Sequence, residues 1–82
     1  MSQQLELERV SNRIAGALIH FCRKRVGKTF HADDLRVFVM RNVGEVAPGS
    51  ADRILRDLRQ RGLINYHVLS RRDSLYYVEW VR

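Results

Sequence analysis

The sequence predicts an α+β fold in which three helices precede a small sheet, because its hydrophobic pattern changes along the chain. Apolar residues recur at alternating spacings of three and four in a long first segment, and similar stripes return in two shorter segments. Residues 63–81 instead combine Tyr, Val and Trp around a polar turn, which favours a pleated surface. A chain of 82 residues has room for one core, so we expect a single domain over residues 1–82.

The first element is a long N-terminal helix within residues 1–26, expected from Gln3 to Val26. Its apolar stripe is made by Leu7, Val10, Ile14, Ala17 and Phe21, with Leu18 beside it. Gly27 follows as a natural stop, because glycine readily adopts the left-handed conformation that ends helices.

This first helix is longer than one small domain needs, and its alternating spacing resembles a heptad. We therefore expect a homodimer, with the interface at Leu7, Val10 and Ile14 and with Gly16 allowing two backbones to come close. The alternative is that residues 2–8 form a frayed tail and the helix covers only its own domain.

A second helix is expected from Ala32, after a short β-strand at residues 28–30. His31 is the expected N-cap, which places Phe30 and Leu35 at the two positions of a hydrophobic staple. We therefore expect Phe30 and Leu35 to pack against each other at the start of this helix.

A third helix is expected over about residues 48–61, since Pro48 suits a first helical position and Gly62 suits an exit. Its apolar face consists of Ala51, Ile54, Leu55 and Leu58. At about 100° per residue, the opposite face holds Gly49, Arg53, Arg56 and Gln60, with Ser50 and Arg59 on its flanks. In the DNA major groove, arginine pairs well with guanine and glutamine with adenine.

The arginines of this helix have an alternative explanation, because acids stand four residues from them. Three such pairs are possible, namely Asp52–Arg56, Arg53–Asp57 and Asp57–Arg61. If these pairs form, their arginines are neutralised locally and the helix face is an ordinary solvated surface.

The C-terminal segment predicts a two-stranded hairpin, with strands over residues 63–70 and 75–81. The connecting turn at residues 71–74 carries Arg71 and Arg72 on a projecting tip. Such a tip could contact a phosphate strand beside a groove. It could equally serve solubility, because Asp73 partly offsets its charge.

The stretch from Lys28 to Val81 resembles a winged helix-turn-helix domain, of the small free-standing type found in bacteria, phages and plasmids. The matching pieces are KTFHADDLRVFV for a strand and the second helix, APGSADRILRDLRQRGLI for the recognition helix and its exit, and NYHVLSRRDSLYYVEWV for the wing. The resemblance implies a winged-helix core over residues 28–81. It also implies that Ser50, Arg53, Arg56 and Gln60 face bases or nearby phosphates, and that Arg71 and Arg72 contact DNA from the wing.

Other classes of function lack a signal in the sequence. There is no glycine-rich phosphate loop, pair of catalytic carboxylates or nucleophile–base signature, so we expect neither an enzyme nor a cofactor. Cys22 is the only cysteine and the three histidines lie on separate segments, so we expect no metal site and a core role for Cys22. No apolar run approaches the length of a membrane span, so we expect a cytoplasmic protein without membrane contact.

The net charge of +6 favours a polyanionic partner. The sequence therefore predicts a protein that binds double-stranded DNA, as a sequence-specific transcriptional regulator or a mobile-element DNA factor. The helix at about residues 48–61 would lie in the major groove through Ser50, Arg53, Arg56, Arg59 and Gln60, and the wing at residues 71–74 would lie on the backbone. Two alternatives stay open, namely a winged-helix module that binds a protein partner, and a non-specific nucleoid-type or RNA-binding protein.

Overall fold

The computed structural model describes the backbone of residues 2–47 and 49–82, and the side chains of residues 11–47 and 49–82. Its elements follow in the order α1 (Ser2–Arg23), β1 (Thr29–His31), α2 (Ala32–Asn42), α3 (Ser50–Gln60), β2 (Ile64–Ser70) and β3 (Leu75–Val81). The predicted α+β class, with helices before a small sheet, is confirmed.

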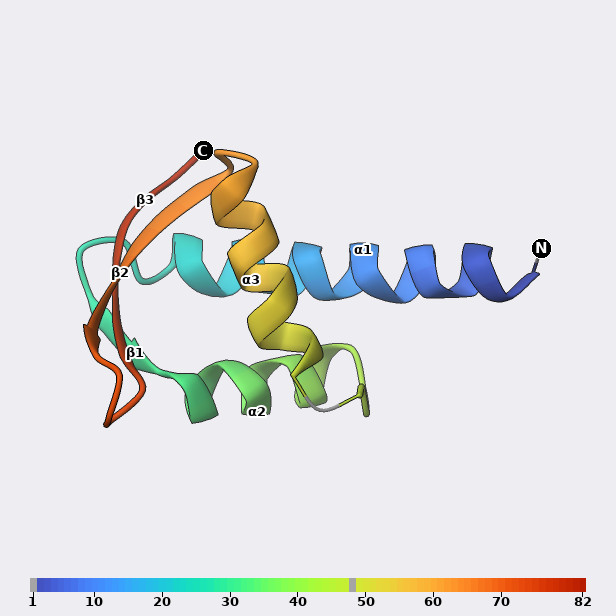
Figure 1. Ribbon diagram of the computed structural model, residues 1–82, viewed down its shortest axis with the longest axis horizontal. Coiled ribbons are helices and arrows are strands. Elements are labelled where there is room, and N and C mark those ends of the chain that lie inside the picture. The colour runs from blue at the N-terminus through green and yellow to red at the C-terminus, as the bar shows by residue number, and fades with distance from the viewer. Residues whose placement is uncertain (1, 48) are drawn as a thin grey trace.

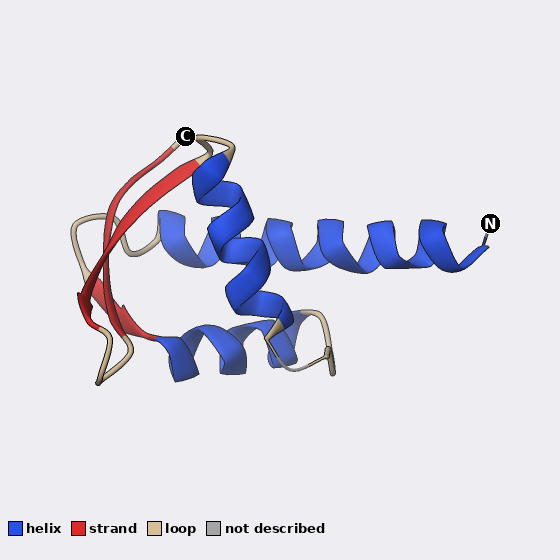
Figure 2. Cartoon of the chain, in the orientation of Figure 1, coloured by secondary structure: helices blue, strands red, loops and turns tan. Residues whose placement is uncertain are grey.

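The helices lie on one side of the molecule and the strands on the other (Figure 2). Helix α1 runs along the longest dimension, α3 crosses it, and the sheet closes the end farthest from the N-terminus (Figure 1). The molecule measures 40 × 23 × 19 Å, and the first turns of α1 extend beyond α2 and α3 (Figure 1).

The prediction of a two-stranded sheet is wrong, because β1 joins the hairpin as a third strand. The antiparallel order is β1-β3-β2, with Phe30 opposite Tyr76. The Phe30 ring stacks on Tyr76 at 5.2 Å between centroids and meets Phe21 edge-to-face at 5.1 Å. The Phe30 ring thus packs between α1 and β3, and this packing stabilises β1 as the third strand of the sheet. A three-residue run carries too little pattern to reveal such pairing.

Helix α1 ends at Arg23, three residues before the predicted end at Val26. The chain turns towards the sheet at this point, and Val26 forms a parallel bridge with Val78. The Gly27 N–H donates to the Val78 carbonyl at 2.8 Å, and Gly27 has a φ of 78°. The predicted glycine stop is therefore wrong, because Gly27 lies four residues beyond the last helical residue and its left-handed conformation serves the turn into the sheet.

The N-terminal cap of α2 is where the sequence predicts it. His31 is extended, with φ −93° and ψ 150°, and its N–H donates to Asp34 Oδ2 at 3.3 Å. Phe30 and Leu35 are both buried, as expected for the staple positions.

Helix α3 begins at Ser50, later than the predicted start, because Gly49 caps it in the left-handed conformation with φ 80°. The expected role of Pro48 lies outside the described residues. The predicted apolar face is confirmed, since Ala51, Ile54, Leu55 and Leu58 are all buried. They meet a core that also contains Ile14, Leu18, Phe21 and Cys22 from α1, Leu35 and Val39 from α2, and Ile64, Tyr66 and Val78 from the sheet.

Candidate nucleic-acid interface

Helix α3 is held on its apolar side by α1, α2 and β2, which leaves its opposite face in solvent. Arg53, Arg56 and Gln60 are exposed along that face, at the positions that the helical spacing predicts. Gly49, at the start of the same stripe, is also exposed. Because these side chains stand on a helix anchored by a packed core, their backbone positions are fixed relative to one another.

The ion pairs of α3 decide whether this face is cationic. Of the three pairs that could neutralise it, Asp57–Arg61 is present, with Nε and Oδ2 3.0 Å apart. Asp52 instead accepts from Arg36 of α2, at 2.9 Å. Among the side chains that the structure describes, Arg53 and Arg56 form no ion pair. The outward arginines are therefore not neutralised by the acids of their own helix.

Arg59 differs from the other arginines, because it turns back onto the sheet. Its guanidinium lies 4.8 Å from the centroid of the Tyr66 ring, and its Nη1 donates to the Tyr66 carbonyl at 3.4 Å. Burial raises the pKa of the Tyr66 hydroxyl, and the nearby positive charge of Arg59 partly offsets that rise. Arg59 thus fastens α3 to β2, although its side chain remains exposed.

Ser50 and Gln60 mark the two ends of the helix. Ser50 is half-buried in the first turn, and its N–H already donates to the Ala47 carbonyl at 3.1 Å. Gln60 is exposed in the last turn. Of these two side chains, Gln60 is the more accessible to a large ligand.

The turn between β2 and β3 exposes both Arg71 and Arg72. Its shape is held by Ser70, whose hydroxyl donates to Asp73 Oδ2 and accepts from the Asp73 N–H, each at 3.2 Å. Ser74 completes the turn with a φ of 51°. The two arginines therefore stand on an ordered tip that also carries one acid.

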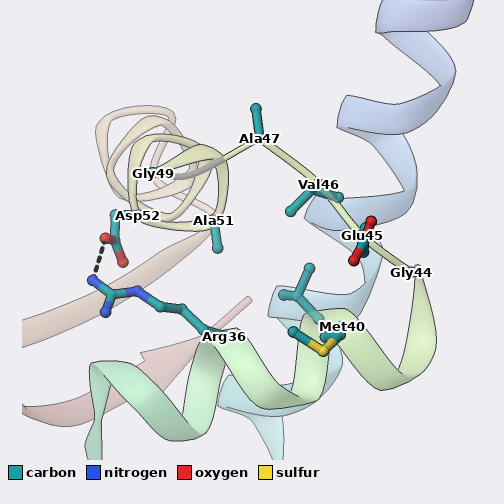
Figure 3. A pocket seen from close by; sticks show the side chains of 10 residues that line it. Arg36, Met40, Gly44, Glu45, Val46, Ala47, Gly49, Ala51 and Asp52 are labelled. Carbon is teal, nitrogen blue, oxygen red and sulfur yellow. Dashed lines mark hydrogen bonds and ion pairs between the residues drawn. The ribbon is translucent and has the colours of Figure 1, made fainter.

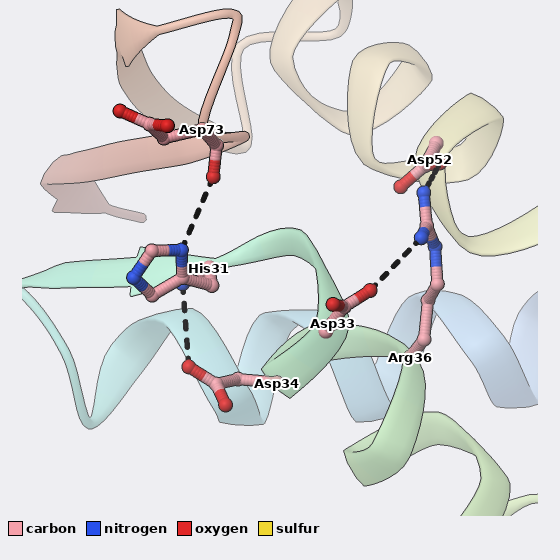
Figure 4. Close-up of polar contacts among 6 residues, drawn as sticks. All are labelled: His31, Asp33, Asp34, Arg36, Asp52 and Asp73. Carbon is pink, nitrogen blue, oxygen red and sulfur yellow. Dashed lines mark hydrogen bonds and ion pairs between the residues drawn. The ribbon is translucent and has the colours of Figure 1, made fainter.

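This tip is tied to the start of α2, as Figure 4 shows. The His31 Nδ1 lies 3.2 Å from the Asp73 carbonyl oxygen, and the Ala32 N–H donates to the Ser74 carbonyl at 3.0 Å. Helix α2 contributes 11 residues, or about 16 Å of length, and the chain leads from its other end to α3. The arginine tip and the start of α3 thus lie towards opposite ends of α2.

Arg36 is the residue of this region that sequence analysis missed. It lies on α2 between the two cationic elements, and it contacts Asp33 as well as Asp52 (Figure 4). The spacing of Asp33 and Arg36 signals a local pair, but the contact with Asp52 joins residues 16 apart. No local pattern indicates a contact of that kind.

A hollow of about 310 Å³ opens between α2 and the loop that leads to α3 (Figure 3). Val39, Met40, Val46 and Ala51 give it an apolar lining, and the Arg36–Asp52 pair stands at its edge. Met40 is 61% exposed, so the hollow is open to solvent on that side.

Cys22 is completely buried in the core, in line with its expected role. Burial raises the pKa of its thiol to about 11, against a smaller opposing effect of Arg25. Among the side chains of residues 11–47 and 49–82, no group of three or more His, Cys, Asp or Glu could hold a metal ion. Over the described backbone of residues 2–47 and 49–82, no helix has the length and apolar character needed to cross a membrane.

Comparison with known proteins gave no match to a family model, to a curated protein or to a solved structure.

Proposed function

We propose that the chain is a winged-helix protein that binds double-stranded DNA, with α3 in the major groove and the 71–74 turn on the backbone. The observation that carries the proposal is the outward face of α3, where Arg53, Arg56 and Gln60 are exposed and the arginines are free of the acids on their own helix. Arg and Gln in one row are side chains suited to reading base edges.

The order of elements also supports the proposal. A strand, two helices and a hairpin follow one another after α1, which is the order that the resemblance to winged helix-turn-helix domains predicts. Arg71 and Arg72 stand at the tip of the hairpin, where a wing would meet the phosphate backbone. We further propose a role as a transcriptional regulator or mobile-element DNA factor, since directional base contacts suit sequence-specific binding.

Selection of bound duplexes from a random pool at near-physiological salt tests this function. An enriched motif is the expected result, because base contacts add to the salt-dependent phosphate term. Binding that depends on salt but enriches no motif would instead support a nucleoid-type protein. Absence of binding to any duplex would contradict the proposal and favour the module that docks a protein partner.

We also propose that two chains associate through the N-terminal half of α1. This half extends beyond α2 and α3 (Figure 1), so it is placed to reach a second copy. Gly16 is exposed, with nothing within 4 Å of an added Cβ, but it stands nine residues after Leu7, about half a turn around the helix, so it does not share a face with Leu7. Ile14 is only 1% exposed and belongs to the core of its own chain. The interface would therefore depend on Leu7 and Val10, whose side chains lie outside the described ones.

Analytical ultracentrifugation at micromolar concentration tests the dimer. We expect a dimer that the double variant Leu7→Asp/Val10→Asp converts to a monomer, since two buried charges in each chain would oppose association. A wild-type chain that sediments as a monomer would contradict dimerisation and leave one α3 reading a single half-site.

A further inference from the structure

Arg36 of α2 connects two helices through its guanidinium. Its Nη2 lies 2.9 Å from Asp52 Oδ2 on α3, and its Nη1 lies 3.1 Å from Asp33 Oδ1 on its own helix. Figure 4 shows the single guanidinium between the two carboxylates. Both terminal nitrogens are thus already engaged with carboxylates of the chain.

Asp52 has a second possible partner that it does not use. Arg56 stands four residues further along α3, and an acid placed before its base at this spacing is the favourable orientation on a helix. Asp52 is nevertheless paired with Arg36, while Asp57 is paired with Arg61. Both acids of α3 are therefore directed away from the row that holds Arg53 and Arg56.

We propose that Arg36 is a positioning residue for DNA binding, which holds Asp52 on the α2 side of α3 and so keeps Arg56 free for the DNA. This inference rests on the proposed function, and it adds to it the reason why the outward face stays cationic. Without Arg36, Asp52 would turn to Arg56, and one base-reading side chain would be neutralised in place.

Neutralising Arg36 alone would not be informative, because any lost positive charge weakens DNA binding. The structure supplies a matched pair of second changes, since one guanidinium contacts both Asp33 and Asp52. Arg36→Gln/Asp52→Asn and Arg36→Gln/Asp33→Asn have the same net charge as the wild type. Each variant removes one acid from the first turn of a helix, and only Arg36→Gln/Asp33→Asn leaves Asp52 able to pair with Arg56.

We expect Arg36→Gln to weaken binding to a selected duplex by about tenfold, within the range expected for loss of one base contact. The control Arg41→Gln removes an exposed arginine of the same helix and should cost only about two- to threefold through net charge. Asp52→Asn should restore affinity in the Arg36→Gln background to within about twofold of wild type, and Asp33→Asn should not. Equal rescue by the two asparagines would overturn the proposal, because net charge alone would then explain the loss. Rescue by neither would also overturn it, since Arg36 would then contact the phosphates itself.

A second measurement without DNA separates this inference from the proposed function. In the free protein, the Arg56 Nε–Hε resonance should shift in Arg36→Gln, return in Arg36→Gln/Asp52→Asn and stay shifted in Arg36→Gln/Asp33→Asn. If the wild type binds no duplex, the proposed function and the DNA role of Arg36 both fail. The Arg56 resonance still shows whether Arg36 keeps Asp52 from pairing with Arg56. An Arg56 resonance that is the same in all four proteins would show that Arg36 does not control Asp52.

Discussion

Helix α3 and the 71–74 turn both expose arginines, but they hold them in different ways. The arginines of α3 stand on a helix whose other side is fixed by four buried side chains. Those of the turn stand on a tip that is shaped by Ser70 and Asp73 and tied to α2 through His31 and Ala32.

Because of this difference, we expect α3 and the turn to make different kinds of contact in the proposed complex. A base-edge contact needs directional hydrogen bonds, so it depends on a side chain whose backbone position is fixed. A phosphate contact depends mainly on charge and tolerates small displacements. Under the proposed function, α3 would therefore supply sequence preference, and the turn would supply affinity for any duplex.

The largest expected effect is on stability, and it tests the support of α3. Leu55→Ala should destabilise the fold by about 2–5 kcal/mol, because it leaves a cavity beneath the helix. Val68→Ala is the control, since Val68 is 41% exposed and a surface truncation should cost within about 0.5 kcal/mol. Urea unfolding of both variants checks this. A Leu55→Ala variant as stable as Val68→Ala would mean that α3 is not anchored as described.

The next effect concerns sequence preference. Arg53→Ala and Arg56→Ala should each cost about 1–3 kcal/mol on a selected duplex and relax the preference at one base position. Arg41→Ala removes the same charge from an exposed position on α2 and should leave the preference intact. Competition binding against single-base variants of the duplex measures this. Loss of affinity without any change in preference would assign α3 to the backbone instead.

The smallest expected effect lies at the turn. Arg71→Ala and Arg72→Ala should weaken binding to all duplexes alike, and each should lower the salt slope by about one unit if one phosphate contact is lost. Titrations at several salt concentrations, with a selected and a scrambled duplex, check both points. A turn variant that changes sequence preference would show that the division between helix and turn is wrong.

Local pattern was enough to predict the α3 face, because spacing along one helix determines which side chains share a side. It was also enough to predict the ends of β3, because a polar turn precedes a run of strand-forming residues. The pairing of the short first strand with the hairpin was not predictable in this way, since it depends on Phe30 meeting Tyr76 from the far end of the chain. The same limit applies to the ion-pair partner of Asp52. Sequence spacing indicated Arg56, whereas in the folded chain Asp52 pairs with Arg36. Long-range contacts of single residues leave no period in the sequence.

The most direct test of the proposed docking is an NMR titration of the wild type with its selected duplex. We predict amide and side-chain shifts at Arg53, Arg56 and Gln60 and at the 71–74 turn, with little change at Trp80, which is exposed on β3. Shifts centred on Trp80, with α3 unchanged, would contradict the account.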